Sequence, residues 1–303
     1  MTRAVFGGIE GGGTKFVCAL GTGPDDIVER VRIPTTSPRE TLSRVVDFFA
    51  RERGDIALRA LGIASFGPLD LRRDSPSFGR VTRTPKSEWD GADLLVTLQH
   101  ALSLPTAIDT DVNGAALGEW HWGAGRNDHN GVLVYVTVGT GVGGGAVIEG
   151  RTLRGNVVHP EMGHVLMPAF DDDTFPGICP FHGRCLEGLA SGPAIEARTG
   201  TVPESLPHDH PTWDLAAKYI ACGLHSMVSI LAPTRIVLGG GVGSAPRMIE
   251  RVRTALRQLD GHYTDGLLGS ARAAENYLVA SELGTDAGIL GAFVLARQAL
   301  DAE

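Results

Sequence analysis

The chain opens, at residues 5–23, with VFGGIEGGGTKFVCALGTG, in which a glycine cluster separates two apolar runs. The same arrangement returns at residues 132–150 as VLVYVTVGTGVGGGAVIEG. Each stretch predicts a β-hairpin with a glycine turn. Backbone N–H groups in a turn that lacks side chains can converge on phosphate oxygens. Each turn is therefore a candidate anion site, with a plain hairpin turn as the alternative.

A third glycine cluster, residues 239–241, follows a strand-like run at 235–238 and precedes a helical pattern at 245–259. It predicts a strand-to-helix turn. Further strand patterns at 60–64 and 106–108 alternate with helical patterns at residues 39–53, 111–122, 186–199, 212–231 and 286–300. This alternation predicts a duplicated α/β architecture with one glycine hairpin opening each half. Residues 70–90 and 203–211 are typical of a long excursion and a surface loop.

Two better-known phosphate motifs are excluded by their sequence context. Gly139, Gly141 and Gly144 match G-x-G-x-x-G, but the next residues form a short β-branched run where a dinucleotide fold needs a helix N-terminus. Gly13-Thr14-Lys15 resembles the end of a P-loop, but the preceding glycine spacing is wrong and an apolar strand-like run comes next. Two glycine hairpins acting together on phosphates remain.

The segment HPEMGHVLMPAFDDDTFPGICPFHGRCLE, residues 159–187, contains a Cys₂His₂ set. The four candidate ligands are His164, Cys179, His182 and Cys185. Thiolate and imidazole suit tetrahedral zinc, and four protein ligands leave no open position, so the pattern indicates a structural zinc rather than a catalytic one. The alternative is a chance cluster of loop residues. A zinc here would also fix two nearby carboxylates, Glu161 and Glu187, in one region.

Composition limits the functional classes. At 303 residues two domains are expected. The net charge of −8, without a basic run, argues against a nucleic-acid partner. No apolar stretch of about 18 residues and no leader-like N-terminus occur, so we expect no membrane partner and a cytoplasmic protein. Cys18 and Cys222 stand singly in apolar surroundings typical of reduced, buried thiols.

Six motifs give the chain a close resemblance to the ROK family of sugar kinases, and within it to the bacterial fructokinases. They are GIEGGGTKF at 8–16, DTDVNGAALGEW at 109–120, TVGTGVGGG at 137–145, HPEMGH at 159–164, CPFHGRCLEG at 179–188 and VLGGGV at 237–242. The resemblance implies duplicated actin-like ATPase (ribonuclease H-like) domains with an interdomain cleft. We expect a smaller domain of residues 1–109 plus 284–303 and a larger zinc-binding domain of residues 110–283.

The resemblance also implies ATP-dependent phosphorylation of D-fructose on its 6-hydroxyl, with Mg-ATP and a structural Zn²⁺ as cofactors. The partners would be a small-molecule sugar and ATP, and the resemblance favours a homodimer. Two alternatives stay open. One is a glucokinase or N-acylmannosamine kinase of the same family, and the other is a non-catalytic protein that binds ATP or sugar.

Residue roles are implied by the same resemblance. Asp111 would be the catalytic base, although Asp109 or Asp111 could instead cap a helix. Sugar hydroxyls would be bound by Glu161, His164 and Glu187, with Thr84 and Thr110 as further candidates. The alternative for the two glutamates is support of the zinc or a solvated surface. His164 would serve twice, because its second ring N–H can donate to a hydroxyl while the other nitrogen binds zinc.

The nucleotide contacts are implied in the same way. Phosphates would be held by Gly12, Gly13, Thr14, Lys15, Thr140 and Gly141, and the nucleoside by Gly240 and Gly241. Lys15 could equally be an exposed strand lysine. Many ROK kinases have Asp where this chain has Glu10, near magnesium, so Glu10 departs from the pattern by one methylene. We expect ATP and water to hold most of the magnesium.

Overall fold

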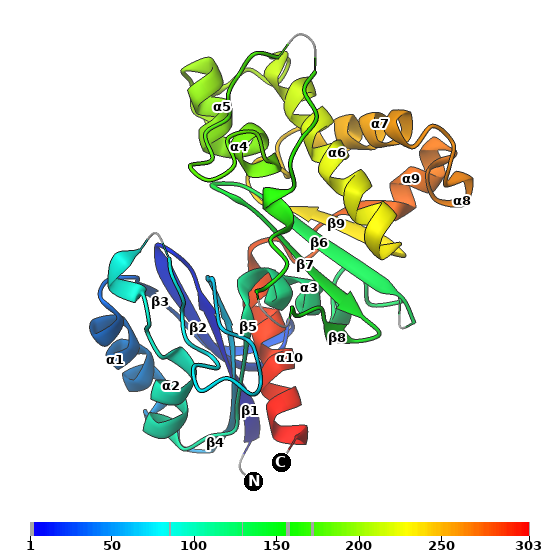
Figure 1. Cartoon of the computed structure of the whole chain (residues 1–303). Helices are drawn as coiled ribbons and strands as arrows, with labels where there is room; N and C mark the ends of the chain where they lie inside the picture. The colour runs from blue at the N-terminus through cyan, green and yellow to red at the C-terminus, as the bar shows by residue number, and fades with distance from the viewer. Residues whose placement is uncertain (1–2, 85, 129, 156–157, 171–172, 303) are drawn as a thin grey trace. The chain divides into compact units, whose positions relative to one another are not determined.

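The computed structural model describes residues 3–84, 86–128, 130–155, 158–170 and 173–302. The chain forms two compact units (Figure 1). Unit 1 comprises residues 1–126, 150–160 and 285–303, and unit 2 comprises residues 127–149 and 161–284. The sequence-based boundaries 1–109, 110–283 and 284–303 stay a prediction. In the structure α3 (Asp111–His121) belongs to unit 1, because it packs on α10 (Ala287–Asp301) and on β4 (Ile56–Ser65).

Unit 1 is built on a sheet with the strand order β3-β2-β1-β4-β5. Its remaining elements are β1 (Arg3–Gly11), β2 (Lys15–Gly23), β3 (Asp26–Pro34), α1 (Pro38–Phe49), the short 3₁₀ turn η1 (Ser87–Trp89), α2 (Leu94–Leu102), β5 (Thr106–Thr110) and β8 (Arg151–Thr152). β1 pairs antiparallel with β2 and parallel with β4, which pairs parallel with β5. The helix α10 (red in Figure 1) packs against β1 and β4, and its residues from Ala287 to Ala296 are all buried.

In unit 2 the strands are arranged across the sheet in the order β7-β6-β9-β10. Its elements are β6 (Val132–Val138), β7 (Val142–Ile148), η2 (Met162–His164), α4 (Leu186–Ala190), α5 (Gly192–Thr199), η3 (Pro203–Ser205), α6 (Thr212–Leu231), β9 (Arg235–Gly239), α7 (Met248–Asp260), α8 (Asp265–Leu268), α9 (Ala271–Tyr277) and β10 (Leu278–Ala280), and η4 (Gly284–Asp286) comes next. β6 pairs antiparallel with β7 and parallel with β9, which pairs parallel with β10. The pattern of β2-β1-β4-β5 is thus repeated, which confirms the predicted duplication and both glycine hairpins.

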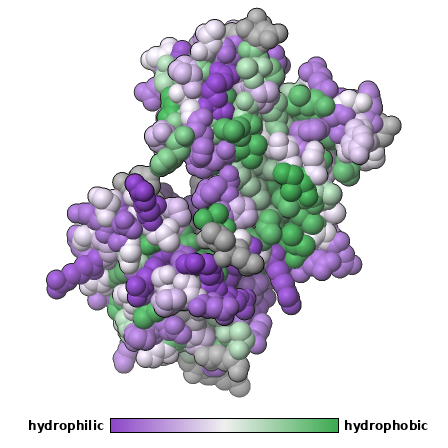
Figure 2. All heavy atoms as spheres, in the orientation of Figure 1, coloured by the Kyte–Doolittle hydropathy of each residue, from purple (hydrophilic) through white to green (hydrophobic). Residues whose placement is uncertain are grey.

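The buried side chains conform to this plan. In unit 1 the core lies between the sheet and helices α1 and α2, around Phe16, Leu61 and Trp89. Figure 2 shows mostly hydrophilic residues on the visible face of unit 1 and hydrophobic residues gathered over the β6–β7 hairpin of unit 2. Within the described part of the chain, no helix combines the length and the apolar character needed to cross a membrane.

One predicted helix is wrong in detail. The sequence predicts a single helix over residues 186–199, but the structure breaks it at Ser191 into α4 and α5. Ser191 has an extended backbone, and its hydroxyl accepts a hydrogen bond from the Ala194 N–H at 3.3 Å. A serine that satisfies a free N–H of the next turn starts a new helix, and Pro193 fits its first turn.

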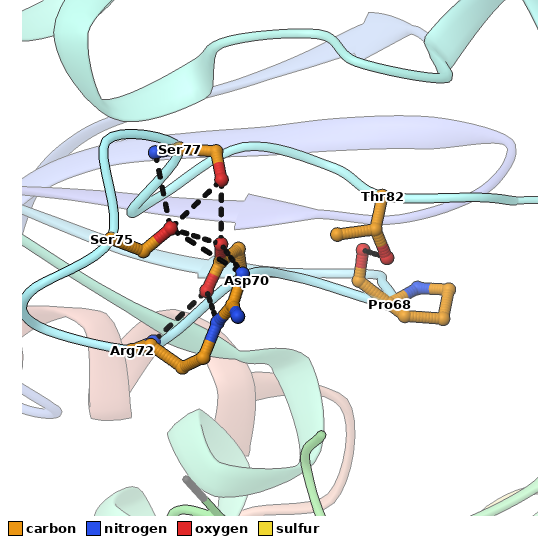
Figure 3. A network of polar contacts seen from close by, with 6 residues as sticks. All are labelled: Pro68, Asp70, Arg72, Ser75, Ser77 and Thr82. Atoms are coloured by element: carbon orange, nitrogen blue, oxygen red, sulfur yellow. Dashed lines mark hydrogen bonds and ion pairs between the residues drawn. The ribbon is translucent and has the colours of Figure 1, made fainter. Parts of the chain in front are cut away.

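The predicted excursion at 70–90 contains an ordered loop centred on Asp70 (Figure 3). This carboxylate is almost fully buried and accepts hydrogen bonds from Arg72 Nε at 2.9 Å, Arg72 Nη2 at 2.7 Å, and the hydroxyls of Ser75 and Ser77 at 2.6 Å each. The hydrogen bonds from Arg72 hold the pKa of Asp70 well below its ordinary value. The loop therefore has a fixed shape although it carries little regular structure.

Candidate active site

The proposed base stands at the start of α3, directly after β5. The N-cap is Thr110, whose hydroxyl accepts a hydrogen bond from the Asn113 N–H at 3.2 Å. The alternative in which Asp109 or Asp111 caps this helix is therefore wrong. Asp111 is the first residue of α3, and its partly buried carboxylate accepts a hydrogen bond from the Val112 N–H at 2.9 Å. Thr110 is 4 % exposed. Its hydroxyl, which the sequence analysis suggested as a sugar contact, is therefore used to cap α3.

Glu10 lies in β1, close enough to Asp111 for the two negative charges to interact. Burial, together with the smaller effect of the Asp111 carboxylate, raises the pKa of Glu10 to about 7. Arg30 and Lys15 act in the opposite direction. The longer glutamate also packs closely on a glycine of α10: a Cβ at Gly288 would lie 2.6 Å from Glu10 Oε1, so an alanine there would displace the glutamate side chain.

The first glycine turn connects β1 to β2. Gly12 N–H donates to the carbonyl of Lys15 at 2.9 Å, and the carbonyl of Thr14 accepts from the Thr35 N–H at 3.0 Å. Thr14 and Lys15 are exposed, and Gly13 is half-buried. The turn is thus held by its own backbone, which leaves these side chains available. The exposure of Lys15 fits both the phosphate role and the plain strand role, so its role stays a prediction.

The loop that carries Thr84 reaches the same turn. Lys86 Cε lies 3.4 Å from the place where a Cβ on Gly13 would stand. Trp89 anchors this loop, because its ring stacks on Phe16 with centroids 5.4 Å apart and its Nε1 donates to the Thr36 carbonyl at 2.8 Å. The structure therefore brings Thr84 into the neighbourhood of the phosphate turn, within unit 1.

In unit 2 the second glycine turn is joined to Glu187. Gly139 N–H donates to the carbonyl of Gly141 at 2.8 Å and closes the turn, on which Thr140 is exposed. Glu187 Oε2 accepts a hydrogen bond from the Val142 N–H at 3.0 Å and lies 2.8 Å from the position of a Cβ on Gly141. This hydrogen bond to the glycine turn differs from both alternatives for Glu187, which were support of the zinc and a position on the solvated surface. A side chain at position 141 would displace the carboxylate from this place.

The third glycine cluster adjoins this turn. Gly240 has a φ of +83°, and the N–H nitrogen of Gly241 lies 3.6 Å from the position of a Cβ on Gly139. The candidate nucleoside and phosphate turns of unit 2 are therefore neighbours. Glu161 is exposed at the start of η2, and its carbonyl accepts from the His164 N–H at 3.0 Å, so these two candidate sugar ligands share one turn.

The structure brings the predicted Cys₂His₂ set together. One ligand atom from each of the four residues lies within 4.8 Å of all the others. Cys179 Sγ is 3.7 Å from Nδ1 of both His164 and His182, and Cys185 Sγ is 3.5 Å from Nδ1 of His164. Ligands about 2.0–2.3 Å from a tetrahedral zinc are separated by about 3.6 Å, so these spacings fit that metal. The four residues therefore form one cluster, and the zinc that would distinguish it from a chance cluster of loop residues stays a prediction.

One of the four residues, Cys185, also caps a helix and has a shifted thiol pKa. Cys185 is the N-cap of α4, where its sulfur accepts from the Gly188 N–H at 3.4 Å. Burial raises the pKa of the Cys185 thiol to about 11. Because a metal binds the thiolate, binding of a divalent cation here must release a proton.

Comparison with known proteins agrees with this arrangement. The chain belongs to the ROK family, which it matches over residues 6–299. It is 42% identical to the fructokinase of Zymomonas mobilis over 302 residues, 98% of each chain. It is 25% identical to the glucokinase of Streptomyces coelicolor over 96% of this chain and 97% of that one. Among solved structures, the ROK hexokinase from Thermus thermophilus superposes with a TM-score of 0.78 at 27% identity, covering 99% of this chain and 100% of the other. The fold is therefore the actin-like ATPase fold of ROK sugar kinases, as expected.

Proposed function

We propose that the protein transfers the γ-phosphoryl group of ATP to the 6-hydroxyl of D-fructose and forms D-fructose 6-phosphate. The observation that carries this proposal is the 42% identity to a fructokinase along 98% of both chains, against 25% to a glucokinase. The residues of the site fit the reaction. Unit 1 contains one glycine turn and Asp111, and unit 2 contains the other glycine turn with Glu187, Glu161 and His164.

Each residue then has a specific task. Mg-ATP, when bound, supplies the phosphoryl group and much of the charge neutralisation. Asp111 accepts the proton of the attacking hydroxyl, which is typically worth about 10²–10⁴ in rate. The N–H of Gly13 and the side chains of Thr14 and Lys15 bind phosphate oxygens, while the N–H of Gly12 stays in its hydrogen bond to the Lys15 carbonyl. Glu187 holds the second glycine turn through Val142 and orients sugar hydroxyls together with Glu161 and His164.

We assign the Cys₂His₂ cluster to a structural zinc. Its support is the ligand set and the 3.5–3.7 Å sulfur–nitrogen spacing. Zinc would join η2, which contains His164 and directly follows Glu161, to the turn before α4, the helix that contains Glu187. The metal would therefore fix the sugar-binding side chains without touching the transferred phosphoryl group.

Two broader proposals complete the assignment. We place the enzyme in the cytoplasm, where ATP is available and free thiols such as Cys18 stay reduced. We also propose a homodimer, which light scattering after size-exclusion chromatography tests directly. A mass equal to one chain of 31.9 kDa would refute the dimer.

A panel of sugars tests the function. Formation of ADP is coupled to a spectrophotometric assay at saturating Mg-ATP, with fructose, glucose, mannose and N-acetylmannosamine as acceptors. We expect fructose to have the highest kcat/KM, because a pocket that hydrogen-bonds hydroxyls can penalise a mismatched sugar by up to about 10⁴. A kcat/KM for glucose or N-acetylmannosamine equal to that for fructose would refute the fructokinase assignment. No turnover of any sugar would favour the non-catalytic alternative.

A further inference from the structure

A buried carboxylate stands beside the proposed base and has no role in the proposed proton transfer. Asp109, at the end of β5, is 0 % exposed. Its Oδ1 accepts hydrogen bonds from the N–H of Thr110 and from Asn113 Nδ2, both at 2.8 Å. Its Oδ2 accepts from Thr152 Oγ1 at 2.7 Å and from Arg154 Nε at 2.8 Å. A buried charge is tolerated only when it is paired and hydrogen-bonded in this way.

The network joins parts of unit 1 that are distant in sequence. Arg154 uses Nη2 to bind both Asp109 Oδ2, at 2.8 Å, and the carbonyl of Ile108, at 3.1 Å. Asn113, in the first turn of α3, donates to Asp109 and also to the carbonyl of Leu153, at 3.1 Å. The end of β5, the first turn of α3 and residues 152–154 are therefore tied to one carboxylate group.

Asp111 lies between two of these attachment points. Thr110 stands immediately before it and Asn113 two residues after it, and both are bound to Asp109. The backbone that carries the Asp111 carboxylate is thus fixed on both sides by this network. The Arg154 guanidinium also compensates the negative charge of Asp109, which would otherwise repel the ionised base two residues away.

We propose that Asp109 and Arg154 are positioning residues that hold Asp111 in the orientation needed to accept the sugar proton. This inference rests on the proposed function of Asp111. Displacement of a reacting group by about 1 Å can cost about 10²-fold in rate even when substrate binding is unchanged. Loss of the Arg154 contact should therefore lower kcat and spare both KM values.

The test compares substitutions on this network with a second arginine–aspartate pair of unit 1, whose arginine lines the same pocket as Arg154 but is bound to a different carboxylate. Arg154→Met removes the guanidinium, Arg154→Lys keeps the charge and one donor, and Thr152→Val removes one hydrogen bond while keeping the side-chain shape. The control is Arg72→Met, which removes the arginine from another buried aspartate, Asp70 (Figure 3). Steady-state kinetics with fructose and Mg-ATP, and circular dichroism to determine the folded fraction, are measured for each variant.

We expect Arg154→Met to lower kcat by about 10- to 100-fold, with both KM values within about threefold of the wild type. Arg154→Lys should recover most of the loss, and Thr152→Val should lower kcat several-fold. Arg72→Met should keep kcat within about twofold. If the network only stabilises the fold, kcat per folded molecule stays at the wild-type value in every variant, and the proposal fails.

Two further results separate the possible failures. If Arg154→Met does not fold, Thr152→Val decides, and a wild-type kcat in that variant overturns the positioning role. Asp111→Asn is measured in the same series. A fully active Asp111→Asn refutes the proposed base, whereas an inactive Asp111→Asn beside a fully active, folded Arg154→Met refutes the positioning role alone.

Discussion

The raised pKa of Glu10 predicts how the stability of the protein depends on pH. Burial and the Asp111 charge raise this pKa from an ordinary value of 4.5 to about 7. A carboxyl group of this kind is destabilising when ionised. Its contribution to stability is complete below about pH 4.5 and is lost as the pH rises through 7. At about 1.4 kcal/mol for each pH unit, the full loss is on the order of 3 kcal/mol.

Glu10→Gln removes this titration while keeping the size of the side chain. The free energy of unfolding of the variant minus that of the wild type should therefore increase by about 3 kcal/mol between pH 4.5 and pH 8.5. Most of the increase should fall below pH 7. Urea unfolding monitored by tryptophan fluorescence suits the measurement, because three of the four tryptophans, Trp89, Trp120 and Trp122, belong to unit 1.

Bound ligands would change the pKa of Glu10, so this experiment is done without them. The buffer contains neither magnesium nor nucleotide, since a cation next to Glu10 would favour the ionised form. Glu52→Gln, at an exposed position of the same unit, serves as the control and should show no pH-dependent difference. A difference between Glu10→Gln and the wild type that is constant from pH 4.5 to 8.5 would show that Glu10 ionises normally, and the reasoning would fail.

Four further predictions concern single positions. Asp111→Asn should lower kcat by about 10² or more, while the Kd of ATP measured by calorimetry stays within a few-fold. Elemental analysis should find one zinc per chain in the wild type and none in Cys179→Ser, whose KM for fructose should rise more than its KM for ATP. Gly288→Ala should lower the free energy of unfolding by about 1–3 kcal/mol, and Glu10→Asp should restore most of it. Gly141→Ala should raise the KM of fructose about tenfold, because its methyl group displaces Glu187.

Each of these predictions has a clear contrary result. Wild-type kcat in Asp111→Asn would assign the base to another residue. Full activity in protein shown to contain no metal would remove the structural role of zinc. If Glu10→Asp does not improve the stability of Gly288→Ala, the two side chains do not compete for the same space. An unchanged KM in Gly141→Ala would separate Glu187 from sugar binding.

The sequence is most informative where function depends on short, local patterns. Both glycine hairpins and the Cys₂His₂ set are predicted from residues that lie close together or repeat a motif, and the structure contains all three. The edge strand β3 is not predicted. Its residues, DIVERVRIP, are mostly exposed or half-buried, and Glu29 interrupts the apolar alternation of Ile27, Val31 and Ile33 that would have indicated a strand.

Contacts between residues far apart in sequence also escape prediction. Arg154 and Asp109 are 45 residues apart, as are Glu187 and Val142. No local spacing connects such pairs, because the fold alone brings them together. Asp109, Thr110 and Asp111 are adjacent and can all cap a helix, so the sequence leaves the N-cap open. In the structure Asp109 is buried at the end of β5, and Thr110 is the N-cap.

The composition of unit 1 from three separate stretches of chain has a consequence for synthesis on the ribosome. Its sheet is complete by residue 110, but α10, which covers β1 and β4 with buried residues from Ala287 to Ala296, is translated only after the whole of unit 2. Unit 2 ends at residue 284 and has all its strands before then. The part of the first sheet that α10 covers must therefore wait for this helix until α10 emerges, and chaperone binding to that part would be strongest in this interval.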